Sequence, residues 1–226
     1  MKARHLFASL LIGLFLLCAS AQAQSILSYY AAIPKSATNW TPAKDLQLPG
    51  FDASLGTLTE VKLTYSAEIW QTLFAENLSA GSTATYDLTT TATFTLGRAD
   101  GPTLINNSAS PTVFHQTGSL GTYDYVPDFG GTSGITLNQD TVISGLYLDP
   151  NLAAYVSLAP IDFSATALAT STLVMHGGTG SDGAATAAAA TLRVDYTYAA
   201  IPEPGAYGAL LGLAALGMII RRRRAA

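Results

Sequence analysis

The sequence predicts an all-β chain, an antiparallel β-sandwich of jelly-roll-like architecture, and three observations support that prediction. Stretches of alternating apolar and polar residues recur along the middle of the chain, as in strands with one buried and one solvated face. Clusters of Gly, Pro, Asn and Asp separate these stretches at short intervals. No regular alternation of strand and helix patterns appears, which argues against a parallel sheet. We therefore expect seven to ten short antiparallel strands.

The chain opens with the pattern of an export signal. A basic stretch, Met1–His5, precedes an apolar stretch, Leu6–Ala19, and the small residues Ala21 and Ala23 then form a cleavage pattern. We expect export through the Sec translocon and removal of residues 1–23 by signal peptidase. The mature chain would then start at Gln24. A permanent N-terminal anchor is the alternative.

The single cysteine, Cys18, lies inside this signal. It follows Leu17, where a lipoprotein signal has a small residue, so we interpret it as part of the apolar stretch. Residues 24–200 then contain neither a disulfide nor a thiolate metal site. They hold five Lys or Arg against fourteen Asp or Glu, a formal charge of −9. This balance argues against a nucleic-acid partner, which would require a basic surface.

The strands follow from the alternation, taken in chain order. Residues 24–49 are irregular and leave room for one short strand at Ile26–Ala32. Odd positions are apolar in Glu60–Ile69, and even positions are apolar in Ala84–Leu96, so each segment predicts a half-buried strand. A run of small residues, Ala184–Ala190, is expected to be a strand rather than a helical turn. Further strands are expected at Thr112–Leu120, Ile135–Val142, Ala153–Leu158, Ile161–Met175 and Thr191–Tyr198.

The last 26 residues combine three features in a fixed order. An apolar run, Ala206–Ile220, would span about 22 Å as a helix and approaches membrane-spanning length when its flanks are included. Because arginines after an apolar helix hold that end in the cytoplasm, residues 24–200 should lie outside. The residues that flank the run are Pro202, Glu203 and Pro204 before it and Arg221, Arg222, Arg223 and Arg224 after it.

This combination resembles the PEP-CTERM protein-sorting signal of bacteria. In proteins with that signal, the tail is thought to be recognised and removed by an exosortase, a membrane cysteine transpeptidase. The resemblance implies a transient inner-membrane anchor formed by one transmembrane sorting helix, followed by delivery to the cell surface or the medium. A plain tail anchor is the alternative. The expected organisation is a signal peptide (1–23), an exported β-sandwich (24–200) and a sorting signal (201–226).

A second resemblance lies in the body of the chain. The segment Leu48–Leu63 and the strand pattern Val194-Asp195-Tyr196-Thr197-Tyr198 are similar to the opening and the end of the choice-of-anchor domains of bacterial surface proteins, type E in particular. Members of that group carry a β-rich domain before alternative C-terminal anchors. The resemblance implies a surface role and brings no enzymatic activity or functional residues with it.

Residues that could support catalysis are few. Beyond the signal only two histidines remain, His115 on the expected solvated face of a strand and His176 at the start of a glycine-rich loop. A Gly-x-Ser-x-Gly nucleophile elbow, a two-histidine zinc motif and a phosphate-binding Gly-Lys-Ser/Thr loop are all missing from the sequence. We therefore expect a protein that is not an enzyme. A glycan hydrolase or lyase that uses two carboxylates is the remaining enzymatic alternative.

The sequence also carries two weak binding signals. Gly177–Asp182 matches one copy of a calcium-binding nonapeptide repeat, whose sites need stacked copies. Asp124 and Asp128 lie four residues apart near glycines, but calcium needs six to eight oxygen ligands. No cofactor is expected, with calcium at Asp124, Asp128 or Asp182 as the weak alternative. Trp70 falls on the polar, even-numbered side of its strand pattern, so its ring could be exposed near a rim of the sandwich and stack on a sugar ring. Packing inside the protein is the commoner role of a tryptophan.

These observations predict a non-catalytic surface or extracellular-matrix protein of a bacterium, associated with exopolysaccharide. A carbohydrate- or calcium-binding module at the cell surface is the alternative. The expected partners are the Sec translocon, signal peptidase, an exosortase-type transpeptidase and exopolysaccharide, with no nucleic acid.

Overall fold

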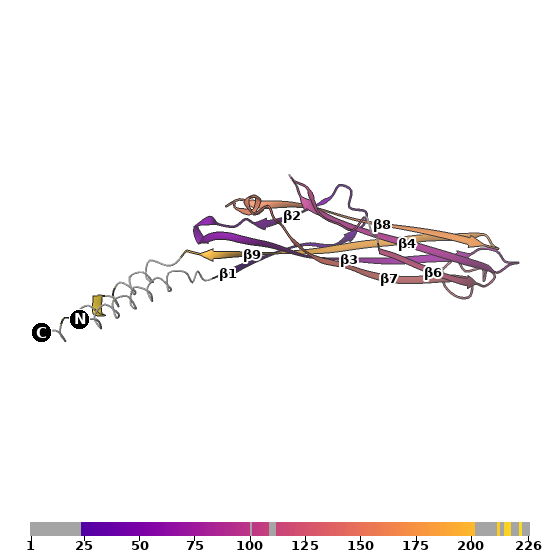
Figure 1. Ribbon diagram of the computed structural model, residues 1–226. Helices are drawn as coiled ribbons and strands as arrows, with labels where there is room; N and C mark the ends of the chain where they lie inside the picture. The colour runs from indigo at the N-terminus through magenta and orange to yellow at the C-terminus, as the bar shows by residue number, and fades with distance from the viewer. Residues whose placement is uncertain are drawn as a thin grey trace.

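The structure is a computed structural model that describes residues 24–99, 101–108, 112–201, 212, 215–217 and 222. Two antiparallel sheets lie face to face and form an elongated sandwich (Figure 1). Two short 3-10 turns, η1 (Ala53–Leu55) and η2 (Leu152–Tyr155), accompany the strands. The strands are β1 (Gln24–Ala37), β2 (Lys44–Pro49), β3 (Gly56–Asn77), β4 (Ala84–Arg98), β5 (Thr103–Asn106), β6 (Thr112–Leu120), β7 (Gly134–Leu148), β8 (Pro160–His176) and β9 (Gly180–Ala200).

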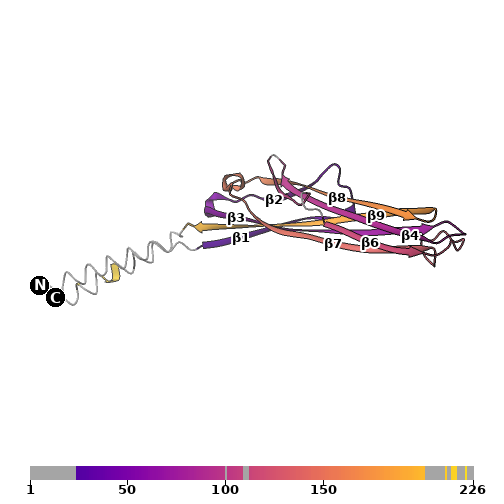
Figure 2. The same cartoon turned by 45° about the vertical axis from the view of Figure 1, so that its right-hand side comes forward.

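The strand order is that of a jelly roll. The first sheet, sheet A, has the order β1-β9-β3-β7, and sheet B has the order β2-β8-β4 with both β5 and β6 paired to β4 (Figure 2). The antiparallel pairs β1–β9, β2–β8 and β3–β7 are nested, as in a long hairpin that has been rolled up. The predicted antiparallel β-sandwich is confirmed.

The predicted alternation forms the core. The side chains of β3 and β4 that point inward are the apolar members of the alternating pattern. Examples that are at most 1% exposed are Val61, Leu63 and Ile69 on β3 and Phe94 and Leu96 on β4. They belong to a large cluster in one half of the sandwich. A smaller cluster fills the other half and consists of Leu73, Ala75, Tyr86, Leu88 and Leu120.

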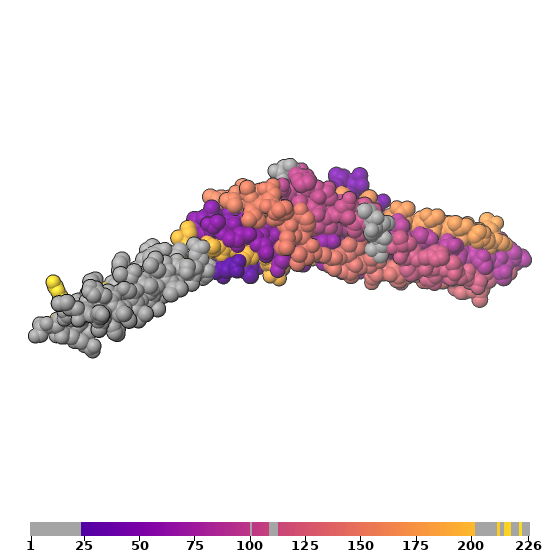
Figure 3. Space-filling model, in the orientation of Figure 1, coloured from indigo at the N-terminus to yellow at the C-terminus, as the bar shows by residue number. Residues whose placement is uncertain are grey.

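The two ends of the sandwich differ in what they carry. Gln24 pairs with Ala199, and Gly56 pairs with Ala200, so β1 begins and β9 ends at the same end of the sandwich, here called the base. The opposite end, the tip, is formed by the loops 78–83, 121–133 and 177–179. Figure 3 shows the elongated body with the base at the left and the tip at the right.

One predicted strand is wrong. Ala153–Leu158 was expected to be extended, but η2 occupies Leu152–Tyr155. Asp149 explains the turn, since its carboxylate accepts hydrogen bonds from the Asn151 N–H at 2.9 Å and from the Tyr155 hydroxyl at 2.7 Å. These two bonds fold the segment back on itself and bury Tyr155 completely.

The sequence also under-predicted several strands. β2 and β5 were not expected, because six and four residues are too short to show a period. β3 and β7 extend beyond the predicted ranges to 22 and 15 residues. β9 begins at Gly180, so it includes the alanine run 184–190 and the second half of the glycine-rich segment 176–183. The loop after His176 is therefore only three residues long.

Candidate functional site at the base of the sandwich

The last strand carries the chain out of the domain at the base. β9 lies between β1 and β3 and is hydrogen-bonded on both sides up to Ala199 and Ala200. The Ile201 N–H then donates to the Leu55 carbonyl at 3.2 Å. Backbone hydrogen bonding therefore continues to Ile201, the first residue of the predicted sorting signal.

Most of the predicted processing residues lie outside the described residues. These are the cleavage residues Ala21 and Ala23 and the sorting residues Pro202, Glu203, Pro204, Arg221, Arg223 and Arg224. Arg222 is described and is exposed and helical. In the part of the chain that the structure describes, no helix has the length and apolar character needed to cross a membrane.

Aromatic rings close the base from inside. Phe51 packs against Tyr196 and Tyr198, with ring centroids 5.8 and 5.2 Å apart, and Tyr155 packs against Tyr196 at 6.1 Å. The Tyr196 hydroxyl donates to the Pro49 carbonyl at 2.9 Å. Burial, aided by the neighbouring Tyr29, raises the pKa of Tyr196. The segments 48–63 and 194–198, which lie far apart in the sequence, thus pack directly on each other.

Two glycines allow this close packing. A Cβ on Gly50 would lie 2.3 Å from the Ser157 carbonyl oxygen. Gly56 has a φ of 152°, and a Cβ there would lie 2.1 Å from the Ala199 carbonyl oxygen. Only glycine fits at either position. Gly50 lets the loop before β3 approach the segment 157–159, and Gly56 lets the start of β3 approach the end of β9.

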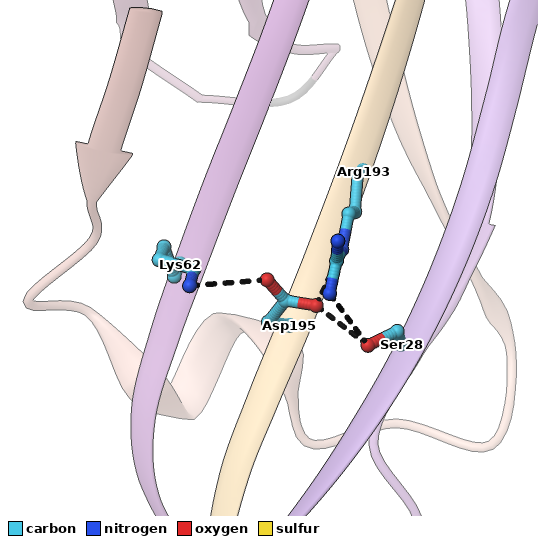
Figure 4. Close-up of polar contacts among 4 residues, drawn as sticks. All are labelled: Ser28, Lys62, Arg193 and Asp195. Carbon is cyan, nitrogen blue, oxygen red and sulfur yellow. Dashed lines mark hydrogen bonds and ion pairs between the residues drawn. The ribbon is translucent and has the colours of Figure 1, made fainter.

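A buried carboxylate joins three strands on the outer face of sheet A near the base (Figure 4). Asp195 on β9 is 3% exposed and accepts a hydrogen bond from the Ser28 hydroxyl of β1 at 2.6 Å. Arg193 Nε donates to it at 2.7 Å, and Lys62 Nζ of β3 lies 3.3 Å from its other oxygen. We call these four residues the Asp195 clamp.

The clamp has a defined electrostatic state. Burial alone would raise the pKa of Asp195, but the hydrogen bonds from Ser28, Arg193 and Lys62 outweigh it and lower that pKa. The same contact raises the pKa of Arg193. The clamp links β1, β9 and β3 through one carboxylate. Because two cations face that carboxylate, the clamp carries a net positive charge, and both cations are partly exposed.

Sequence reasoning missed the clamp. Alternation placed Asp195 on the solvated face of its strand, and the side chain does point to that face, yet its neighbours cover it. The sequence did contain one indication of an ion pair: Asp195 lies two residues after Arg193, and their neighbours in the strand are apolar. The partners Ser28 and Lys62 become visible only when the strand order is known.

Trp70 lies in the middle of sheet A and not at a rim. Its strand neighbours are Ala187 on β9 and Asp140 on β7, and its side chain is half-buried. Lys35 Nζ lies 4.0 Å from its ring centroid, within cation–π distance. A second pair on this face places Arg193 5.4 Å from the ring of Tyr30.

The tip is organised by two buried polar residues at the end of β3. Glu76, 1% exposed, accepts from the Phe129 N–H at 3.0 Å and from the Ser133 hydroxyl at 3.2 Å. Asn77, fully buried, donates to the carbonyls of Ser82 at 2.8 Å and Gly121 at 2.7 Å. Together these side chains tie the loops 78–83 and 121–133 to the sandwich.

The three predicted calcium candidates lie on different structures. Asp124 and Asp128 each accept a hydrogen bond from a backbone N–H two residues ahead, in separate turns of the loop 121–133. Asp182 is not in a loop but in β9, opposite Ala75. Among the described residues, no three His, Cys, Asp or Glu side chains gather in a way that could hold a metal ion.

The two histidines occupy the surface. His115 lies on the solvated face as predicted, and its Nε2 is 2.6 Å from an oxygen of Asp87. Both partners are about half-exposed. His176 is exposed at the end of β8. Neither histidine is bonded to a serine or threonine hydroxyl in the hydrogen bonds of the described residues, so no activated nucleophile is seen there.

Comparison with known proteins identifies the tail. The family model of the PEP-CTERM protein-sorting motif matches residues 200–224. The chain carries this sorting motif. It implies an exported protein with a C-terminal sorting signal that is targeted to an exosortase. The predicted PEP-CTERM motif is therefore confirmed, and the matched segment starts at Ala200, the last residue of β9.

The other comparisons give no further identification. No curated protein matches the chain. Among solved structures, a particle of infectious bursal disease virus, Gx strain, is 11% identical over 79% of this chain and 37% of its own, with a TM-score of 0.19. Desmodium yellow mottle tymovirus is 6% identical over 80% of this chain and 91% of its own, with a TM-score of 0.20. The chain spans less than half the length of the infectious bursal disease virus chain.

Proposed function

We propose that this protein is an exported, non-catalytic surface or matrix protein of a bacterium. Its tail holds it in the inner membrane for a time, and an exosortase-type transpeptidase then processes that tail. The product is the β-sandwich, delivered to the cell surface or the medium in association with exopolysaccharide. The observation that carries the proposal is the PEP-CTERM motif at residues 200–224.

The position of the motif on the fold supports processing. Because β9 is paired up to Ala200, Pro202 is the second residue beyond the sheet. Proline cannot donate a ladder hydrogen bond, so Pro202 and Pro204 favour an extended segment rather than more sheet. Cleavage near these prolines would leave the sandwich with almost no free tail, and the Asp195 clamp would hold the last strand in place.

The outer face of sheet A supports an association with polysaccharide. It carries two aromatic rings, Trp70 and Tyr30, each next to a cation. The hydroxyl-bearing residues Ser66 and Thr191 lie between them on β3 and β9, and Thr64 lies opposite Arg193. Flat sheet faces with aromatic rings and hydroxyl groups suit sugar rings, which offer both an apolar face and hydrogen-bonding edges.

Intact mass spectrometry of the protein from cells and from the medium tests the processing. The proposal expects a product that starts at Gln24 and ends close to Glu203. The difference in mass from the full chain identifies both cuts at once. A mature pool that retains residues 206–226 would contradict it.

Retention on exopolysaccharide from the producing cells tests the association. Trp70→Ala is expected to weaken binding several-fold, while Tyr125→Ala, which changes an exposed aromatic residue at the tip, is the matched control. Equal retention of both variants and the unchanged protein would count against the outer face of sheet A. Binding that appears only with added calcium would favour a calcium-binding module instead.

A further inference from the structure

The base of the sandwich carries a group of exposed apolar side chains on neighbouring loops. Leu158, on the loop between β7 and β8, is 86% exposed and is the most exposed large apolar residue that the structure describes. Val156 on the same loop is 45% exposed, Leu55 in η1 is 40% exposed, and Ile201 is 60% exposed. We call these four residues the basal collar.

The members of the collar are held in place by backbone contacts. Val156 forms a bridge with Phe51, and the Ser157 N–H donates to the Phe51 carbonyl at 3.2 Å. Leu55 and Ile201 are joined by the hydrogen bond from the Ile201 N–H. The loop of Leu158 is therefore bound to the segment 51–55, and the same segment is bound to the strand end from which the tail departs. Figure 1 shows η2 at that same end of the domain.

The length of the tail fixes how far the collar can be from a bilayer. Only Ile201–Gly205 separate β9 from the apolar run Ala206–Ile220. Five extended residues reach at most about 18 Å. The headgroup layer on each side of the hydrocarbon is about 5–7 Å thick. In an anchored precursor, the base of the sandwich therefore lies at most about 18 Å from the start of the apolar run, close to the lipid surface.

We propose that the basal collar docks on the bilayer and seats the anchored precursor upright on the membrane before its tail is processed. This inference rests on the proposed membrane-anchored stage. Exposed leucine and isoleucine side chains gain free energy when they enter the headgroup and acyl boundary. Asp52 at the start of η1 and Glu60 in β3 are acidic and lie near the same end, and the cations Lys62 and Arg193 are paired with Asp195 on the outer face of sheet A. We therefore infer an apolar contact and not an attraction to anionic lipids. The collar becomes free when the tail is removed.

Site-directed spin labelling of the full chain tests the docking. The only native cysteine is Cys18, so a Cys18→Ala background accepts a single label at Leu158→Cys. The full chain, with its tail, is reconstituted in nanodiscs of phosphatidylethanolamine and phosphatidylglycerol. We expect the label at 158 to collide several-fold more with lipid-soluble oxygen than with a water-soluble nickel chelate, and this ratio should not change at high salt.

The matched control is Val142→Cys, an exposed position on the side of β7, 62% exposed, where water should dominate. Val156→Cys provides a second collar position if the first variant folds poorly. Equal water exposure at 158 and 142 would overturn the proposal, and so would burial of the 158 label only when a transpeptidase is present. Retention of the tail in the mature pool would instead refute the proposed processing, and the label would still report on the anchored chain.

Discussion

The base and the tip of this sandwich are built in different ways, although the same long strands run through both. At the base, four strands of sheet A lie side by side and large aromatic rings fill the space between the sheets. Towards the tip, β1 has ended at Ala37 and β2 covers only the first residues of β8. The base is thus the broader and more densely connected end, as suits the end that bears the tail.

The interior near the tip is less well packed. A hollow of about 80 Å³ opens there between β8 and β9, lined by Leu88, Leu173 and Ala184 among others. Buried polar atoms without hydrogen-bond partners cost stability, but among the described residues they occur in both halves: Gln71 Nε2, Thr90 Oγ1 and Ser171 Oγ towards the tip, and Ser36 Oγ, Trp40 Nε1 and Arg98 Nε and Nη1 in the other half. The contrast between the two ends therefore rests on the strand pairing and on the hollow. From these we expect lower local stability where the loops of the tip are presented.

Truncating one core residue at each end gives the largest expected effect. Phe51→Ala should lower the free energy of unfolding by about 4 kcal/mol, because a fully buried ring is lost from an aromatic cluster. Leu88→Ala should cost about 2.5 kcal/mol, because its site already adjoins a hollow. Equilibrium urea unfolding of the two variants measures the difference. Equal costs, or a larger cost for Leu88→Ala, would break the comparison.

The Asp195 clamp should account for the next largest difference. Asp195→Ala leaves Lys62 and Arg193 without their shared carboxylate and is expected to cost about 2 kcal/mol, less than a fully buried pair because both cations are half-exposed. The matched control is Asp140→Ala, an exposed carboxylate on the same face, which should change stability by less than about 0.5 kcal/mol. A cost for Asp195→Ala as small as that of the control would show that the clamp is not stabilising.

At the tip, Glu76→Ala should act mainly locally. It removes the acceptor of the Phe129 N–H and the Ser133 hydroxyl and should cost about 1.5 kcal/mol. Hydrogen exchange should accelerate in the loop 121–133 and remain unchanged in β9 near Tyr196. Faster exchange along the whole of β9 would mean that the two ends unfold as one unit.

The pH dependence should have the smallest effect and should arise at the base. The pKa of Asp195 is lowered in the folded protein, so the folded state binds fewer protons than the unfolded state near the usual aspartate pKa of about 3.9. Stability from the clamp is therefore complete above that pH and is lost as the pH falls through the lower, folded value. Asp195→Asn should flatten the acid limb of a stability-against-pH curve. An unchanged limb would assign acid unfolding to other carboxylates.

Much of the fold could be predicted because alternation reports burial directly. The alternate apolar residues of Glu60–Ile69 and Ala84–Leu96 form the inner faces of β3 and β4, as predicted. The small residues Ala184–Ala190 are part of β9, as predicted. Alternation fails where another contact decides the backbone. The Asp149 side chain turned Ala153–Leu158 into η2, and β2 and β5 were too short to show a period.

The functional residues divide in the same way. The sorting signal is a linear motif, so its order along the chain was enough to find it, and the family match at residues 200–224 confirmed it. The clamp, the basal collar and the Glu76 contacts depend on residues far apart in sequence. Ser28 and Asp195, for example, are 167 positions apart and meet only because β1 and β9 pair. Such sites need the strand order before they can be recognised.

A pulse–chase experiment on the sorting residues tests the central claim most directly. The unchanged chain and a variant with Pro202, Glu203 and Pro204 all replaced by alanine are labelled in the native cells, and the membrane and medium fractions are followed with time. The account predicts that the unchanged chain shortens at its C-terminus and leaves the inner membrane, while the variant accumulates there at the length of the anchored precursor. Equal shortening and release of both chains would contradict it.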